Sequence, residues 1–205
     1  MYSIEKWSLG PLGTMGYVYH NGKRGLIIDP SLHPQEMLAF IEASRITVEA
    51  ILLTHGHFDH YLGIFEVHDA LGPLPVYIHP QGRQLLQNPI MSGAEMVGED
   101  LAYRGETVPV AEGPFSVGDF SFEVFHIPGH SPGGVAYYAP PYLFTGDILF
   151  CGAVGRTDFR GYGDHEALIS GIRKKLLSLP DDTIILPGHG GGSSIGTEKA
   201  NNPFL

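Results

Sequence analysis

The sequence predicts an α+β fold in which two β-sheets pack face to face and helices cover their outer sides. Strand-like segments fall into two groups, one in each half of the chain, and each group is accompanied by an amphipathic helix. The chain has 205 residues, 43% of them hydrophobic, which suffices for one well-buried core and is short for two. No internal repeat of about 20 to 50 residues is visible.

The first half of the chain reads as strands that alternate with helices. Its opening strands are separated by "GPLG" and "NGKR", and the second contains the Asn-Gly dipeptide typical of a hairpin turn. In "PQEMLAFIEAS" a proline stands at the first helical position, and Met37, Phe40 and Ile41 recur at helical spacing. The predicted strands are 2–9, 15–20, 24–28, 48–54 and 76–79, and the predicted helices are 34–44 and 61–71.

The second half begins with a long segment, residues 88–118, that is rich in Gly, Pro and acidic residues. We expect a surface excursion there, and loops longer than about 12 to 15 residues often serve as lids or binding loops. Further on, "FSFEVFHI" alternates with a period of two, and "GDHEALISGIRKKLLSL" has Asp164 as a candidate N-cap before a one-sided apolar face. The predicted strands are 120–127, 134–140, 142–147 and 182–190, and the predicted helix is 163–179.

The composition argues against several classes of partner. The chain carries 22 acidic and 12 basic side chains, and its formal net charge of -10 repels phosphate backbones and anionic membranes. We therefore expect neither nucleic acid nor membrane as a partner, and the longest apolar runs are far short of the roughly 20 residues that cross a bilayer. Cys151 is the only cysteine, and no signal-peptide pattern opens the chain. These features predict a cytoplasmic protein and leave its oligomeric state open.

The segment "THGHFDH", residues 54–60, places three histidines and one aspartate directly after an apolar strand. Such side chains need partners for their polar atoms when they leave water, so the cluster indicates a bound ion. In an extended backbone His55 and His57 point to the same side and can bind one ion. Asp59 and His60 follow where the chain turns into a helix, so they can reach a second position beside the first.

Three further candidate ligands come from distant parts of the chain. His130 in "IPGHSPGG", Asp147 in "FTGD" and His189 in "LPGHGGG" each follow an apolar strand and stand beside glycine, which lets the backbone fold closely. Nitrogen and oxygen ligands without thiolate favour Zn²⁺, with Fe or Mn as alternatives, and an aspartate can bridge two ions. We thus expect two divalent metal ions, between which a water molecule would be hydroxide at neutral pH.

These residues resemble the metallo-β-lactamase superfamily of metallohydrolases, whose H-x-H-x-D-H signature is matched by residues 55–60. The segments "HIPGHSPGG", "GDILFCGAVGRTDF" and "LPGHGGGSSIGTEKANNPFL" are similar to the glyoxalase II-like branch in its short single-domain form. The resemblance implies one hydrolase domain over 1–205, built as a four-layer αββα sandwich with the metals at one edge between the sheets. No helical C-terminal glutathione-binding domain is expected, since the chain stops sixteen residues after His189.

The resemblance also implies how the ligands divide and what they do. The first ion would be held by His55, His57 and His130, the second by Asp59, His60 and His189, with Asp147 as the bridge. The implied activity is cleavage of a small-molecule thioester such as S-D-lactoylglutathione by a metal-bridging hydroxide, which Asp59 helps to orient. A thiol has a pKa near 8.5, so its thiolate leaves with little help from a general acid.

Other activities are weighed against this one. "GRTDF" and the early histidine motif are also similar to persulfide dioxygenases, in which one iron held by two histidines and a carboxylate activates O₂. "PGHG" around His189 argues against that reading, because this branch usually has an alanine before the last histidine. A non-catalytic metal-binding domain is less favoured because the ligand set is complete. Among other superfamily activities, the acidic charge weakens nuclease action, and nothing in the cytoplasmic profile supports β-lactamase action.

Several residues outside the ligand set have competing interpretations. Arg156 in "GRTDF" is either a substrate-binding residue for an anionic group or the ion-pair partner of Asp158 or Asp164. We expect Cys151 to be a small buried side chain among apolar neighbours. Of the histidines outside the set, His126 is the one placed to support a ligand from behind.

Two features near the cluster add detail. Asp29 in "IIDP" resembles a family position near the metals, and a role in a turn is the alternative. After the signature, "YLG" stands where the family usually has a small residue and paired glycines, which predicts that Tyr61 and Leu62 lie against the site.

Overall fold

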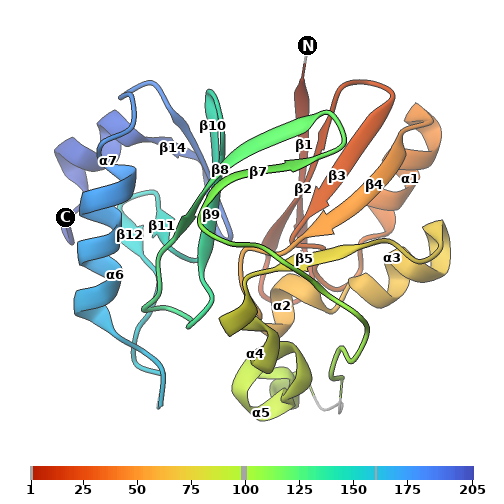
Figure 1. Cartoon of the computed structure of the whole chain (residues 1–205), viewed down its shortest axis with the longest axis horizontal. Coiled ribbons are helices and arrows are strands. Elements are labelled where there is room, and N and C mark those ends of the chain that lie inside the picture. Colours follow the sequence, from red (N-terminus) through yellow and green to blue (C-terminus); the bar gives the residue numbers. More distant parts are fainter. Residues whose placement is uncertain (1, 98–100, 160) are drawn as a thin grey trace.

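The computed structural model describes residues 2–97, 101–159 and 161–205, and within them the chain forms two six-stranded sheets. In Figure 1, helices α1 (Gln35–Ser44) and α3 (Ile64–Leu71) lie outside one sheet, and α6 (His165–Gly171) and α7 (Ile195–Asn201) lie outside the other. The predicted four-layer αββα sandwich is therefore confirmed.

The first sheet has the strand order β1-β2-β3-β4-β5-β6. Its first three strands pair antiparallel through tight turns, whereas β3 to β6 pair parallel because helical connections return the chain to the same edge. The strands are β1 (Ser3–Leu9), β2 (Thr14–His20), β3 (Arg24–Ile28), β4 (Thr47–Leu52), β5 (Val76–Ile78) and β6 (Val108–Pro109).

The second sheet has the order β14-β13-β10-β9-β8-β7, and a separate hairpin, β11 and β12, follows β10. The pair β10 and β13 is parallel, so both strands end at the same edge. The strands are β7 (Gly113–Val117), β8 (Phe120–His126), β9 (Val135–Ala139), β10 (Tyr142–Gly146), β11 (Leu149–Phe150), β12 (Ala153–Val154), β13 (Ile184–Pro187) and β14 (Ser193–Ser194).

Strand β4 shows how the layers are held together. Its side chains alternate, so Ala50 and Leu52 join the cluster between the sheets, while Ile51 and Leu53, the residue that follows the strand, join the cluster beneath the helices. All four are fully buried. A strand that is covered on both faces needs apolar side chains at successive positions, which explains the continuous apolar run "AILL".

The predicted helix over 61–71 is divided. The structure has α2 (Phe58–Tyr61) and then α3, and the chain turns at Gly63, whose N–H donates to the carbonyl of Pro30 at 2.9 Å. A Cβ at Gly63 would lie 2.0 Å from the carbonyl oxygen of Ser31, so only glycine permits this approach. The prediction that Tyr61 and Leu62 face the site is wrong, because both pack into the cluster between the first sheet and its helices.

The predicted surface excursion over 88–118 is mostly exposed or half-buried, but several of its residues are anchored in the core. The segment contains buried residues, among them Ser92, Tyr103 and Val110. The Tyr61 hydroxyl donates to the carbonyl of Leu101 at 2.9 Å and so fastens the segment to the core. Residues 98–100 of the excursion lie outside the described residues. Its elements and those just before it are η1 (Pro80–Gly82), α4 (Arg83–Gln87), α5 (Pro89–Ser92), η2 (Ala94–Val97), β6 and β7.

The C-terminal helices follow the sequence in part. Asp164 caps α6 as predicted, with its carboxylate accepting from Ala167 N–H at 2.9 Å, and η3 (Ile172–Leu176) continues it as a π-helical turn. Helix α7 is not predicted, although Ser194 caps it by accepting from Thr197 N–H at 3.2 Å. Within the described residues, no helix is long and apolar enough to cross a membrane.

Candidate metal centre

The motif "THGHFDH" lies at the edge of the first sheet, between the end of β4 and helix α2. His57 is the extended residue before α2, so His55 and His57 project from the loop and Asp59 and His60 project from the helix. All four side chains are buried. The two local conformations therefore present two pairs of ligands from different directions, as the spacing predicts.

His55, His57 and His130 form a compact group that we call the histidine triad. Nδ1 of His57 lies 3.0 Å from Nε2 of His55 and 2.9 Å from Nε2 of His130. His130 comes from the loop after β8, so the triad joins the two sheets. Three ring nitrogens thus converge on one point.

In His55 and His130, the hydrogen bond of the ring nitrogen that faces away from the triad shows which nitrogen carries the proton. Nδ1 of His130 lies 2.9 Å from the carbonyl oxygen of Arg156, and because a carbonyl only accepts, this nitrogen carries the proton. Nδ1 of His55 lies 3.1 Å from the hydroxyl of Thr54, which donates its single proton to Asp29 at 2.6 Å. His55 is therefore also protonated on Nδ1, and the inward nitrogens of both histidines carry lone pairs.

Asp59, His60 and His189 form a second group, which we call the mixed triad. Nε2 of His189 lies 3.2 Å from Oδ2 of Asp59, and Nε2 of His60 lies 3.5 Å from the same oxygen. Asp59 also accepts a hydrogen bond of 2.6 Å from the Thr14 hydroxyl, which fixes the orientation of its carboxylate.

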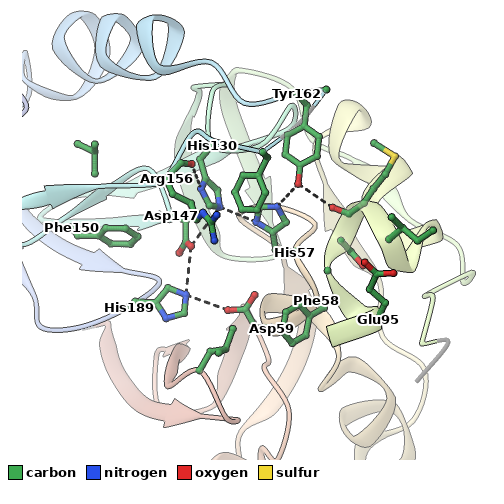
Figure 2. A pocket seen from close by; sticks show the side chains of 18 of the residues that line it. His57, Phe58, Asp59, Glu95, His130, Asp147, Phe150, Arg156, Tyr162 and His189 are labelled. Carbon is green, nitrogen blue, oxygen red and sulfur yellow. Dashed lines mark hydrogen bonds and ion pairs between the residues drawn. The ribbon is translucent and has the colours of Figure 1, made fainter. Parts of the chain in front are cut away.

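Asp147, at the end of β10, lies between the two triads. Its carboxylate is 3.3 Å from His60 and 3.5 Å from His189 in the mixed triad, and 3.5 Å from His130 in the histidine triad. Figure 2 shows Asp147 between His130 and His189. The seven predicted ligands are therefore brought together, and Asp147 has the position that a bridging ligand requires.

Asp29 supports the centre from behind. Its carboxylate accepts from the backbone N–H and the hydroxyl of Thr54 at 2.8 and 2.6 Å, and it lies 2.9 Å from Nδ1 of His60. Asp29 adopts a positive φ of 50°, which Asp and Asn tolerate better than most residues. Asp29 therefore has both of the roles considered for it, because it lies in the turn after β3 and it also orients His60. The orientation leaves Nε2 of His60 directed inward.

Gly188 gives His60 and Asp147 the room that they need. A Cβ on Gly188 would lie 2.2 Å from Oδ1 of Asp147 and 2.7 Å from Cε1 of His60. The backbone of Gly188 is held between the sheets, since its N–H donates to Gly146 at 2.8 Å and its carbonyl accepts from Met15 at 2.7 Å. The "PGHG" turn therefore places His189 beside the other ligands.

Electrostatics differ between the triads. Burial lowers the pKa of His57 to about 3, with repulsion from His130 adding to the effect, and burial likewise lowers the pKa of His55 and His130. Burial also acts to lower the pKa of His189, but its hydrogen bonds to Asp147 and Asp59 raise it to about 9. Burial likewise acts to lower the pKa of His60, but Asp59, Asp147 and Asp29 raise it well above its usual value. The histidine triad is thus neutral at pH 7, and both histidines of the mixed triad hold a proton.

The residues present fit metal ions. Two buried polar atoms among the described residues, Nε2 of His60 and Oδ1 of Asp147, point into the centre and lie 3.3 Å apart, but neither forms a hydrogen bond. Buried polar atoms normally have partners, and a cation would satisfy both. The inward lone pairs of His55 and His130 in the histidine triad also need a partner, and a cation would satisfy them. The donor set of imidazole nitrogen and carboxylate oxygen suits Zn²⁺ and Fe.

A cavity of about 1080 Å³ opens at the centre, and His57, Asp59, His130, Asp147 and His189 line it. Its walls are largely apolar and come from separate elements. The apolar lining residues are Leu12, Phe58, Ile90, Met91, Phe150, Ala153, Val154 and Phe159. The volume is sufficient for a small-molecule substrate with groups on both sides of a reacting carbonyl.

The structure bears on three sequence-based interpretations. Arg156 lines the cavity, but its guanidinium forms two hydrogen bonds to Asp158, at 2.7 and 2.8 Å, which is the ion-pair alternative. The prediction that Cys151 is buried is wrong, since it lies exposed in the turn between β11 and β12. The apolar residues next to it in sequence do not cover its side chain in the fold. His126 supports no ligand; its Nε2 donates to Pro132, and its ring stacks on His79.

Among the described residues, sequence reasoning missed three side chains that form hydrogen bonds with the candidate ligands: Thr14, Thr54 and Tyr162. Thr14 begins β2, forms a β-bridge with His189 and is 45 positions from Asp59. No local pattern relates these residues, so the contacts follow only from the packing of the sheets. Thr54 is the exception, because a hydroxyl directly before the first ligand of "HGHFDH" was a signal available in the sequence.

The fold and the centre define a metal-binding αββα protein with its site at the edge between the sheets. Residues 9–189 match the profile described as the metallo-beta-lactamase superfamily, and the chain belongs to this family, as its signature predicts. Hydroxyacylglutathione hydrolase GloC of Haemophilus influenzae is 36% identical over 193 residues, which cover 92% of this chain and 90% of GloC.

Two solved structures are also similar along their full length. BLEG-1 B3 metallo-beta-lactamase has a TM-score of 0.92 and 39% identity, with 99% of both chains covered. TTHA1623, solved in a di-iron-bound form, has a TM-score of 0.86 and 39% identity, with 98% of this chain and 100% of that chain covered. The superfamily consists generally of hydrolytic metalloenzymes, and this chain carries the corresponding cluster of His and Asp.

Proposed function

We propose that this protein is a binuclear metal-dependent hydrolase that cleaves thioesters, with S-D-lactoylglutathione as the first substrate to test. The observation that carries the proposal is the position of Asp147 between the histidine triad and the mixed triad, beside a cavity that both triads line. A centre for one iron would leave the second triad without a purpose, which is why we favour two ions over the oxygenase alternative.

The residues that would hold the ions are those of the two triads together with Asp147. Zn²⁺ suits this donor set best, and Fe and Mn are the alternatives, of which Fe is supported by the di-iron form of TTHA1623. When bound, such ions activate water for attack and stabilise the charge that develops on a carbonyl oxygen.

Asp59 would act on the attacking water. Its carboxylate is oriented by the Thr14 hydroxyl at 2.6 Å and lines the cavity, so it can accept a hydrogen bond from the water and direct it toward the carbonyl. Although burial acts to raise the pKa of Asp59, the charge of His60 and the hydrogen bond from His189 lower it to about 2, which keeps it an acceptor at neutral pH.

The cavity supports a thioester as the substrate. It places apolar walls on both sides of the metal centre, and Arg156 on one wall is a candidate for an anionic group, for which it would exchange its contacts with Asp158. A thiolate is a better leaving group than an amine, so hydrolysis needs no strong acid beside the centre. GloC, whose name describes hydrolysis of an acylated glutathione, supports the same substrate class.

A second candidate activity is the opening of a β-lactam ring, which the similarity to BLEG-1 favours. Both reactions begin with attack of water on a carbonyl, and they differ in the atom that leaves. A β-lactam nitrogen leaves as an amine and needs a proton, whereas a thiolate does not. The two activities can therefore be separated by direct comparison of substrates.

The test combines metal analysis with a panel of substrates. Protein loaded with Zn²⁺, Fe²⁺ or Mn²⁺ is analysed for metal per chain and given S-D-lactoylglutathione, a chromogenic cephalosporin, or glutathione persulfide with dissolved oxygen. Thiol release, ring opening and oxygen uptake are followed separately. We expect thiol release that requires two ions per chain, and His57→Ala should abolish it.

Each other outcome excludes the proposal. No turnover of any thioester by fully loaded protein removes it. Turnover of the cephalosporin alone establishes the second candidate, and oxygen uptake with one iron per chain establishes the persulfide dioxygenase alternative. Thiol release that His57→Ala leaves unchanged would place the activity elsewhere.

A further inference from the structure

The hydroxyl of Tyr162 contacts two segments that lie far from it in the chain (Figure 2). It lies 2.9 Å from Nε2 of His57, and it donates a hydrogen bond of 3.0 Å to the carbonyl oxygen of Met91. His57 belongs to the histidine triad, and Met91 belongs to α5, which lines the cavity. The proposed reaction uses neither contact.

The two contacts together determine where His57 carries its proton. A tyrosine hydroxyl has one proton, and because a backbone carbonyl only accepts, that proton points to Met91. The hydroxyl oxygen is then an acceptor toward His57, so Nε2 of His57 must carry the imidazole proton. The lone pair of the neutral ring is left on Nδ1, the atom that faces His55 and His130.

Tyr162 is held firmly enough to impose this arrangement. Its ring stacks on Phe159, with centroids 5.3 Å apart and planes 19° apart, and Phe159 packs on the ring of His57 at 4.7 Å. The chain after Tyr162 is fixed, since Gly163 N–H donates to the carbonyl of Phe159 at 2.9 Å and Asp164 caps α6. The hydroxyl therefore has a defined position between the ligand and the cavity wall.

The carbonyl group of Met91 is available to accept the hydrogen bond from Tyr162. Helix α5 has only four residues, so most of its carbonyl groups have no partner within the helix. Asn88 caps its N-terminus by accepting from the N–H groups of Ile90 and Met91, at 3.1 and 3.2 Å. Tyr162 supplies the donor for the carbonyl at the other end and so ties α5 to the metal centre.

We propose that Tyr162 is a positioning residue that sets the tautomer of His57 and links this ligand to the α5 wall of the cavity. With Nδ1 engaged by a bound ion, Nε2–H of His57 would be a stronger donor to Tyr162, and the Tyr162 hydroxyl would in turn donate more strongly to Met91. Metal binding at the histidine triad and the order of α5 are thereby coupled. The inference rests on the proposed metal centre and is independent of the thioester as substrate.

The first experiment reads the tautomer directly in metal-free protein. Nitrogen NMR of ¹⁵N-histidine-labelled wild-type protein at pH 7.5 distinguishes Nε2–H from Nδ1–H imidazole. We expect Nε2–H for His57, and in Tyr162→Phe, which keeps the stacked ring and loses the hydroxyl, a mixture of the two forms. An Nδ1–H imidazole at His57 in the wild type overturns the proposal, whatever the activity of the enzyme.

The second experiment measures metal affinity and the order of α5 in the same variant. Zn²⁺ binding at the histidine triad is measured by competition with a chromophoric chelator, and we expect Tyr162→Phe to weaken it by about 10- to 100-fold. Hydrogen exchange of the amides of Ser92 and Gly93, which donate to Asn88 and Ile90, reports on α5. Zn²⁺ should slow this exchange in the wild type, and in Tyr162→Phe the slowing should be lost.

Tyr61→Phe is the matched control. The Tyr61 hydroxyl contacts Ser92 at 3.3 Å and Leu101 at 2.9 Å, but no metal ligand. This variant should therefore speed exchange at Ser92 while Zn²⁺ affinity stays within twofold of the wild type. Equal Zn²⁺ affinity in Tyr162→Phe and Tyr61→Phe overturns the proposal, because Tyr162 would then only pack the wall. Should Tyr162→Phe fail to fold, the wild-type tautomer decides.

Discussion

The two triads use similar side chains in opposite electrostatic states. The histidine triad is buried and neutral, and burial holds the pKa of His57 near 3. In the mixed triad, burial also favours the neutral form of His60. The carboxylates of Asp59, Asp147 and Asp29 outweigh this effect and hold the pKa of His60 well above its usual value. A cation enters the first triad without displacing a proton, and the second only by displacing the protons of His60 and His189.

The difference shows how one short motif can build two unlike sites. His55 and His57 meet a third histidine from the second sheet, whereas Asp59 and His60 meet His189 and the carboxylate of Asp147. The partners, rather than the motif itself, set the charge of each site. Changes in those partners therefore test the comparison best.

Loss of the shared carboxylate should have the largest effect. Asp147→Asn removes the charge that lies between the triads, and we expect thioester hydrolysis to fall by on the order of a thousandfold, which corresponds to several kcal/mol of transition-state stabilisation. Metal analysis should show fewer than two ions per chain. The exposed Asp182→Asn, which changes net charge equally, should keep full activity. Full activity in Asp147→Asn would show that the triads work independently.

Crowding the mixed triad should have the next largest effect. The added Cβ of Gly188→Ala would lie 2.2 Å from Asp147 and 2.7 Å from His60, so both side chains must shift. A displacement of about 1 Å at a catalytic site costs on the order of a hundredfold in rate, and we expect kcat to fall by that amount. Gly191→Ala is the control, because its Cβ meets open space and should leave kcat unchanged. Equal rates in both variants would show that the mixed triad tolerates displacement.

Removing the charge behind His60 should weaken one triad selectively. Asp29→Asn keeps a side chain that tolerates the positive φ at this position, but an amide cannot accept from Thr54 and His60 as the carboxylate does. We expect the affinity of the mixed triad for Zn²⁺ to fall by about 10- to 100-fold, as for other partners of metal ligands. Chelator competition with two resolved equivalents measures this. A larger loss at the histidine triad would mean that Thr54 and His55 carry the effect of Asp29.

Much of this centre was predictable from the sequence, because each ligand follows an apolar strand beside glycine. His130, Asp147 and His189 share that context, and strands of a sandwich that end at one edge bring such residues together. The strands themselves follow from alternation and apolar runs, as β4 and β8 show. Local pattern was therefore sufficient for most of the long strands and for the convergence of the candidate ligands.

The supporting contacts were not predictable, since they join residues with no relation in sequence. Thr14 reaches Asp59 across the start of β2, and Tyr162 reaches His57 from the loop before α6. The few buried positions within 88–118 were missed for a similar reason, because its apolar residues, such as Tyr103, are spaced without helical or strand period. Cys151 shows the opposite error, because it was predicted to be buried and is exposed. Its neighbours in sequence are apolar, but it lies in a turn, where they do not cover its side chain.

The most direct test of the comparison needs no substitution, because it is the pH dependence of metal binding. With its pKa raised to about 9, His189 is protonated at pH 7 in metal-free protein, so the affinity of the mixed triad should fall as pH is lowered, by about tenfold per pH unit for each proton displaced. With its pKa lowered to about 3, His57 is neutral throughout, so the histidine triad should bind equally at pH 8 and pH 6.

The measurement is a titration of metal-free protein with Zn²⁺ at pH 8, 7 and 6 in the presence of a chromophoric chelator whose own pH dependence is known. We expect the first equivalent to bind with constant affinity and the second to weaken between pH 8 and pH 6, by about a hundredfold for the proton of His189 and further for the proton of His60. Proton release, followed in weak buffer, should accompany only the second equivalent. Equal weakening of both equivalents would mean that the carboxylates act on all six ligands of the two triads alike, and the electrostatic contrast between the triads would then not govern binding.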